Sequence, residues 1–206
     1  MWATTITLLL ALWAGPAAGA DRIVLDGVTF AAEHGGLRLV DGWGRGSRED
    51  PFVLVEEITG HGAAVLTVRD PNTRFGRPAT GQVGIGFVLK KIVTNRTARP
   101  WTIFAMELRQ ELVVPSDYFD GLSFHQSGER GAYVFSDRFS AVDLTDEPAD
   151  RLAFSRAVIE PGETVTVQVA VTDHSPVSPF FLIQRRDAPL AGVAPTVVEE
   201  DPTCAC

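Results

Sequence analysis

The sequence has few of the features that mark disulfide-stapled, membrane-spanning or nucleic-acid-binding proteins. Its only two cysteines, Cys204 and Cys206, lie at the very end of the chain, so the fold does not depend on disulfides. No segment after the first twenty residues reaches the roughly 18 apolar residues of a membrane-spanning helix. Acidic residues outnumber basic ones, 26 to 18, and the bases are scattered. We therefore expect no transmembrane segment in the mature chain and no nucleic-acid partner.

Catalytic signatures are missing as well. The four histidines, His34, His61, His125 and His174, form neither a His-x-His nor a His-x-x-x-His pair that would direct two imidazoles at one metal. No Gly-x-Ser-x-Gly elbow accompanies His125. The glycine-rich stretches 42–46 and 81–86 each lead into an expected strand, whereas phosphate-binding loops lead into a helix. The histidines and the glycine-rich stretches thus indicate no metal or nucleotide site, and we expect no cofactor.

The first twenty residues carry no charged side chain and have the layout of a secretory signal. Residues 6–14 form a short apolar run, Pro16 interrupts it, and the small residues Ala18, Gly19 and Ala20 precede Asp21. The run is too short to cross a bilayer, which takes about 20 apolar residues. We therefore expect residues 1–20 to be a cleaved signal peptide and the protein to be exported, to the periplasm or the extracellular space.

From residue 21 to about residue 186, short apolar or alternating runs are separated by Gly, Pro, Asn and Asp, the rhythm of a sandwich or barrel. The expected strands are 28–32, 37–41, 52–58, 63–69, 84–94, 101–112, 132–142, 152–159, 164–172 and 180–184. Alternation is clearest where Val165, Val167, Val169 and Val171 share one face. The pattern predicts an all-β, antiparallel two-sheet sandwich, immunoglobulin-like or related, of roughly eight to ten strands.

Two of these strands, 152–159 and 164–172, flank the sequence Glu-Pro-Gly-Glu at 160–163, which suits a type II turn and predicts a hairpin. Segment 101–112 favours a strand over a helix because its apolar residues alternate with charged ones. The expected core consists of the large apolar side chains on these runs: Phe52, Leu54, Phe87, Leu89, Trp101, Phe104, Met106, Leu108, Phe154, Val165, Val167, Val169 and Phe181.

Residues 187–206 lose the pattern, since three prolines interrupt small and acidic residues. Too little apolar surface is available there to offset the entropy of ordering. We expect a sandwich domain of residues 21–186 and a disordered, acidic, proline-containing tail that ends in Cys-Ala-Cys. Cys204 and Cys206 either have no role in the fold or bind a soft metal or take part in redox chemistry.

Residues 42–50 combine an aromatic ring and two guanidinium groups with three glycines. An aromatic side chain on the rim of a sandwich can stack on a sugar ring, and arginine can hold polar or acidic groups beside it. Our hypothesis is that Trp43 contacts a glycan or another envelope ligand, with Arg45 and Arg48 as polar contacts. In the alternative, Trp43 closes one end of the core and the glycines only bend the chain.

Acidic residues raise further hypotheses. One group comprises Asp143, Asp146, Glu147 and Asp150, and a second comprises Asp117, Asp120 and Glu129. Neither has the Asp-x-Asp-x-Asp-Gly spacing of a calcium loop, which favours solvated turns. A carboxylate pair across a cleft would make an exported glycan-acting enzyme. That pair would be drawn from Asp117, Asp120, Glu129, Asp143 and Asp146.

Asn95-Arg96-Thr97 matches a glycan acceptor triplet and equally suits a turn between strands. It lies in the stretch 93–104, VTNRTARPWTIF, which resembles the VTN-T-x-x-x-W-x-x-F hairpin of bacterial exported β-sandwich domains, common in PEP-CTERM and related choice-of-anchor exoproteins. Segments 120–124, 161–167 and 180–184 are similar to the same domains. The resemblance implies an immunoglobulin-like or related sandwich outside the cytoplasm. Unlike those proteins, this chain shows no Pro-Glu-Pro signal near its end.

The polar residues lie mainly in expected turns, and no nucleophile has a base beside it in the sequence. This favours a non-enzymatic binding or structural module of the cell envelope or extracellular matrix. Two alternatives stay open: an exported carbohydrate-active enzyme with paired carboxylates, and a metal or redox role of the Cys-Ala-Cys end.

Overall fold

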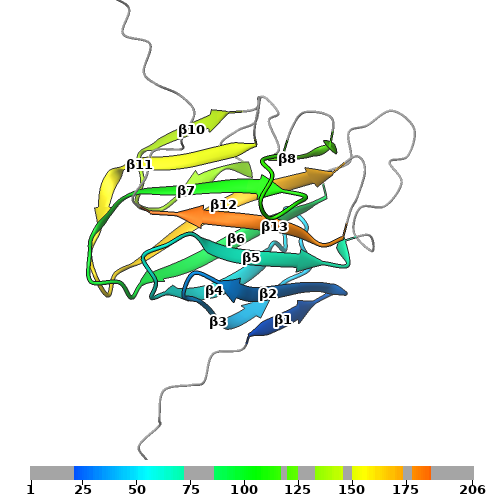
Figure 1. The fold of residues 1–206 in the computed structure, drawn as a ribbon, viewed down its shortest axis with the longest axis horizontal. Coiled ribbons are helices and arrows are strands. Elements are labelled where there is room, and N and C mark those ends of the chain that lie inside the picture. The colour runs from blue at the N-terminus through cyan, green and yellow to red at the C-terminus, as the bar shows by residue number, and fades with distance from the viewer. Residues whose placement is uncertain are drawn as a thin grey trace, which may run out of the picture.

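The computed structural model describes residues 21–71, 86–116, 120–124, 133–145, 150–173 and 178–186. Within these residues the chain forms strands that pack as two sheets (Figure 1), which confirms the predicted all-β sandwich. The strands are β1 (Arg22–Leu25), β2 (Val28–His34), β3 (Leu37–Trp43), β4 (Phe52–Ile58), β5 (Ala64–Arg69), β6 (Phe87–Asn95), β7 (Trp101–Arg109), β8 (Leu122–Phe124), β9 (Phe135–Ser136), β10 (Ala141–Thr145), β11 (Arg151–Ile159), β12 (Thr164–Asp173) and β13 (Phe180–Arg185).

The seven-stranded sheet has the order β1-β2-β5-β13-β7-β11-β10, and the six-stranded sheet has the order β3-β4-β6-β12-β8, with β9 also paired to β12. In Figure 1 the strands β5, β13 and β7 lie in front of β4, β6 and β12. Among the described strands the pairs are antiparallel with one exception, because β4 and β6 run parallel. They do so because the strand between them in the sequence, β5, belongs to the other sheet.

The predicted turn at residues 160–163 is present, but the predicted hairpin is wrong. Gly162 has a φ of 87°, and the Glu163 N–H donates to the Glu160 carbonyl at 3.0 Å. However, β11 pairs with β7 and β10, whereas β12 pairs with β6, β8 and β9. The turn therefore carries the chain from one sheet to the other. Both strands bury an apolar face between the sheets, but β11 does so from one sheet and β12 from the other. Alternation alone cannot distinguish two strands in facing sheets from two strands paired in the same sheet.

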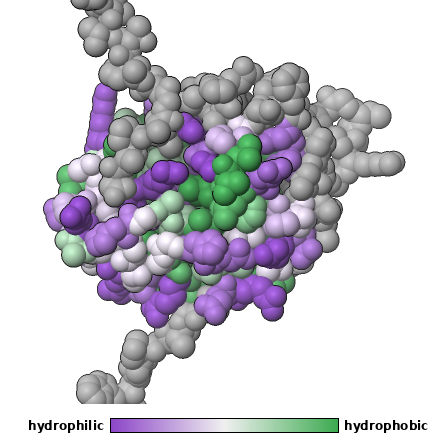
Figure 2. Space-filling model, viewed as in Figure 1, coloured by the Kyte–Doolittle hydropathy of each residue, from purple (hydrophilic) through white to green (hydrophobic). Residues whose placement is uncertain are grey.

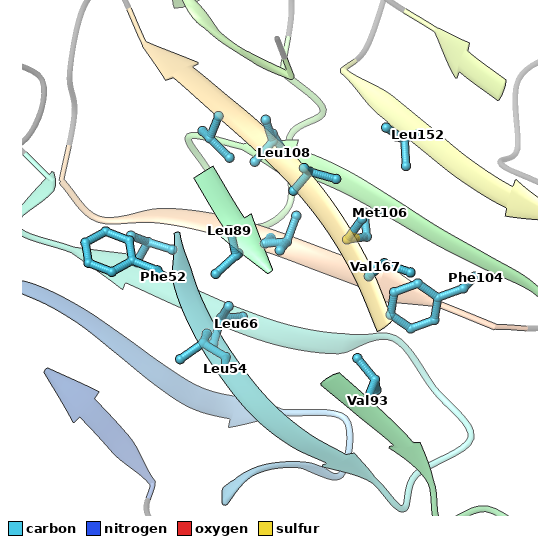
Figure 3. Close-up of a cluster of buried hydrophobic side chains, with 14 of the residues drawn as sticks. Phe52, Leu54, Leu66, Leu89, Val93, Phe104, Met106, Leu108, Leu152 and Val167 are labelled. Atoms are coloured by element: carbon cyan, nitrogen blue, oxygen red, sulfur yellow. The ribbon is translucent and has the colours of Figure 1, made fainter. Parts of the chain in front are cut away.

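The core lies between the sheets, and Figure 3 shows part of it. All of the predicted core residues are buried except Phe181. Phe180 and Leu182 point inward from β13, each 1% exposed, so Phe181 faces outward and is half-buried. The predicted strand 132–142 is wrong as one element: β9 joins the six-stranded sheet and β10 the seven-stranded sheet.

Asn95 ties the corner between β6 and β7 to β11. Its side chain is fully buried, and Nδ2 donates to the carbonyl oxygens of Arg99 and Ile159, both at 2.9 Å. Oδ1 accepts from the N–H and the hydroxyl of Thr97, and that hydroxyl accepts from Trp101 Nε1 at 3.2 Å. The Asn-x-Thr triplet is thus a structural turn, because the nitrogen that would carry a glycan is buried and already makes two hydrogen bonds.

The expected signal peptide (1–20) and the expected tail (187–206) with Cys204 and Cys206 lie outside the described residues. Among the residues that the structure describes, no helix has the length and apolar character needed to span a membrane.

Candidate functional site

Trp43 ends β3 and lies on the outer face of the six-stranded sheet. A β-bulge between Leu39 and Asp41 shifts the register of β3 against β4. Before the bulge, Leu39 points inward and is fully buried. After the bulge, Trp43 pairs with Val53, which points outward because the residues on either side of it in β4 point into the core. The extra residue turns the indole outward, since strict alternation would place residues 39 and 43 on the same face. Trp43 is 48% exposed, so it does not close the core.

Backbone pairing sets five side chains in one line across this outer face. Trp43 of β3 is opposite Val53 of β4, Val53 is beside Lys90 of β6, Lys90 is opposite Gln168 of β12, and Gln168 is opposite Phe135 of β9. We call these five residues the outer row. Phe135 is 46% exposed, Val53 is buried, and Lys90 and Gln168 are half-buried. An exposed ring therefore stands at each end of the row, with an ammonium and a carboxamide between them.

The outer row is long and is built on paired strands. Its two end strands are separated by four strand spacings of about 4.8 Å, which puts about 19 Å between Trp43 and Phe135. The central side chains offer hydrogen-bond donors from Lys90 and both donors and acceptors from Gln168. Because all five residues lie on strands, the chemistry of the row is fixed by the sheet and does not depend on a loop.

The loop after β3 folds back onto the same sheet. Gly44 and Gly46 have φ values of 98° and 81°, and the Gly46 carbonyl accepts from the Val88 N–H at 2.9 Å. The guanidinium of Arg48 lies over the ring of Tyr133, 5.3 Å from its centroid. Tyr133 packs with Val88 and Ala170 on the outer face. Arg48 therefore lies on the same surface as Trp43 and the rest of the outer row.

Arg45 is placed differently. Its side chain is 79% exposed, and Nε lies 3.9 Å from an Asp50 oxygen, an ion pair open to solvent. Its backbone N–H donates to the Asp50 carbonyl at 3.1 Å, which closes the loop. The structure thus places Trp43 and Arg48 against the outer face and Arg45 at its rim. That all three bind a ligand stays a prediction.

An ion-pair cluster holds the other end of this face. Glu57 contacts Arg38 of β3 and lies 2.9 Å from Arg96. Partial burial pushes the pKa of Glu57 upward, but the hydrogen bonds from Arg96 and Arg38 outweigh it and hold the pKa below its usual value. Glu57 therefore stays ionised and anchors two positive groups at the end of the face away from the outer row.

The opposite surface differs in character. Figure 2 shows the side of the seven-stranded sheet, where apolar atoms gather in one patch among polar ones. On that sheet Glu107 is 2% exposed and is held by Arg109 at 2.8 Å and Arg151 at 3.5 Å. Its outward aromatic ring, Phe181, is only half-buried against the sheet. No described aromatic residue there is as exposed as Trp43 or Phe135.

The carboxylates predicted for a catalytic or calcium site are not brought together by the described part of the chain. Asp117, Glu129, Asp146 and Glu147 lie outside it, as do His125 and His174. Asp120 Oδ1 accepts the Leu122 N–H at 2.9 Å in the turn before β8, while Asp143 is exposed on β10 of the other sheet and Asp150 is buried. His34 and His61 are exposed. No group of three His, Cys, Asp or Glu side chains suited to a metal occurs among the described residues.

Sequence reasoning singled out Trp43, Arg45 and Arg48, but it did not point to Lys90, Phe135 and Gln168, which lie in one line with Trp43 on the outer face. Lys90 and Gln168 look like ordinary polar positions of alternating strands. Phe135 was placed in a longer strand whose partner was unknown. Only the pairing of β9 with β12 sets its ring in line with Trp43.

Comparisons with family models, with curated proteins and with solved structures find no match. The fold defines the class as an all-β two-sheet sandwich, and the case for function depends on the outer face.

Proposed function

We propose that this protein is a non-enzymatic binding module of the cell envelope or extracellular matrix that holds an extended glycan along the outer row. One observation carries the proposal: two half-exposed aromatic rings, Trp43 and Phe135, stand at the ends of one cross-strand line with Lys90 and Gln168 between them. An exported glycan-binding role also agrees with the signal-like first twenty residues.

The chemistry of the row suits a chain of sugars. A sugar ring has an apolar face that packs on an aromatic ring, and hydroxyls at its edge that exchange hydrogen bonds with amine and amide groups. A ligand that reaches both rings must be extended, because about 19 Å separates the strands that carry them. The two aromatic side chains have only two torsions each and stand on paired strands, so they lose little freedom on binding, which favours affinity from a shallow surface.

Affinity electrophoresis tests the proposal. Native gels would contain soluble neutral or acidic polysaccharides, and retardation would be measured for the wild type, Trp43→Ala, Phe135→Ala and the control Phe181→Ala. Phe181 is a suitable control because it is an outward aromatic residue on the other sheet. Circular dichroism would check that each variant folds.

We expect at least one polysaccharide to retard the wild type. Each of the two outer-row variants should weaken that binding about fivefold, since a lost aromatic contact is worth about 1 kcal/mol. Phe181→Ala should bind as the wild type does. Absence of retardation on every polymer, or equal binding by Trp43→Ala and the wild type, would reject the proposal.

A further inference from the structure

A lysine and a glutamate meet inside the core. Lys91 points inward from β6, between Leu89 and Val93, and its side chain is 0% exposed. Glu56 points inward from the neighbouring strand β4 and is also 0% exposed. Lys91 Nζ donates a hydrogen bond to Glu56 Oε1. The two side chains thus join adjacent parallel strands within the sandwich.

The surroundings do not suit a pair of charges. In the strand register Lys91 lies between Leu54 and Val167, and Glu56 lies beside Val93, all of them buried (Figure 3). Among the described residues Glu56 Oε2 has no hydrogen-bond partner. Within the same part of the chain Nζ makes one hydrogen bond, to Glu56, whereas an ammonium carries three N–H donors. Charged groups left without partners in an apolar interior are strongly disfavoured.

The choice of lysine is informative. The chain has sixteen arginines and only two lysines, Lys90 and Lys91, and it is a lysine that lies in the core. Burial lowers the pKa of Lys91 despite the opposing effect of Glu56. A guanidinium stays protonated, but an amine in such a place can lose its proton and act as a nucleophile.

We propose that Lys91 and Glu56 condense to an intramolecular amide that cross-links β6 to β4. A proton passes from Nζ to the Glu56 carboxylate along their hydrogen bond, and the free amine then attacks Cδ, so that an Nζ–Cδ bond forms. The bond from Cδ to one carboxyl oxygen breaks. That oxygen leaves as water, with the transferred proton and one further proton from Nζ. No oxidant, metal or second reactant is required.

The product fits the core better than the ion pair does. An amide presents one N–H and one carbonyl, fewer polar groups than an ammonium and a carboxylate together. The apolar surroundings also keep out water, which would drive the reverse reaction.

The intact mass of the folded, purified wild-type protein, measured after reduction of its cysteines, tests the proposal. We expect a mass lower than that of the chain by one water molecule, whereas Lys91→Met should show its full sequence mass. Reductive methylation of the denatured protein provides an internal control. Lys90, half-buried on the outer face, should be methylated together with the N-terminal amine, and Lys91 should not.

A full-length mass with both lysines methylated would overturn the proposal, and it would do so even if Lys91→Met failed to fold. Loss of one ammonia in place of water would also overturn it, because the bond would then join Lys91 to a carboxamide. Gln184 would be the first residue to examine, since its amide is fully buried without a partner among the described residues.

Discussion

Replacing Asn95 with alanine is expected to be among the most destabilising single changes to a polar side chain in this protein. Asn95 makes four side-chain hydrogen bonds, to the carbonyls of Arg99 and Ile159 and to the N–H and hydroxyl of Thr97. The Thr97 hydroxyl and the Arg99 carbonyl would still bond to each other, at 3.0 Å. The Thr97 N–H and the Ile159 carbonyl would each lose the bond to Asn95.

The expected cost follows from those two groups. A buried donor or acceptor that loses its partner costs about 1–3 kcal/mol, so Asn95→Ala should lower the free energy of unfolding by about 2–6 kcal/mol. Asn95→Asp keeps the shape and the acceptor but removes both donors, and it should also destabilise the protein. Thr94→Ala is a suitable control, because the Thr94 hydroxyl bonds Thr164 at 3.0 Å on the exposed face.

Urea unfolding followed by circular dichroism measures these differences. Thr94→Ala should cost less than about 1 kcal/mol, as most surface changes do. If Asn95→Ala lay within about 1 kcal/mol of Thr94→Ala, the buried corner would not hold the strands together as described.

Further predictions concern charge and backbone. Glu57→Gln should cost about 1 kcal/mol at neutral pH, because Glu57 bonds the part-exposed Arg38 and Arg96. The folded protein holds the pKa of Glu57 below the ordinary value of 4.5, so the ionised carboxylate stabilises the fold above pH 4.5. This stabilisation is lost as the pH falls through the lowered pKa, so the unfolding free energies of the wild type and Glu57→Gln should converge in acid. Gly44→Ala should cost about 1–3 kcal/mol in thermal unfolding, since φ is 98° and the new Cβ would lie 1.9 Å from a carbonyl oxygen. Gly62→Ala, which meets nothing within 4 Å, should be nearly neutral, and equal melting temperatures for the two glycine variants would contradict the loop geometry.

The sequence was informative wherever burial follows a simple period. The valines of β12 alternate with polar residues, and the inward ones are fully buried or nearly so. The two sheets and most of the core could therefore be predicted. Which strands share a sheet could not be predicted, because β11 and β12 would show the same kind of alternation if they paired in one sheet or if they faced each other across the core.

The candidate site was predictable only in part. Composition drew attention to Trp43, but a one-residue bulge decides that its ring faces outward. Phe135 is distant in sequence from Trp43, and only the strand order aligns the two. For the core pair there was a readable signal: Lys90 and Lys91 are adjacent in one strand, so one of them had to face inward.

The dependence of affinity on ligand length tests most directly whether the outer row holds an extended glycan. Oligosaccharides of increasing length, cut from a polymer that the wild type binds, would be titrated by calorimetry. We expect affinity to rise until the oligomer spans about 19 Å, the distance from Trp43 to Phe135, and then to level off. Phe135→Ala should lose the gain from the longer oligomers. If the shortest fragment bound as tightly as the longest, or if Phe135→Ala kept the full length dependence, binding along the outer row would be contradicted.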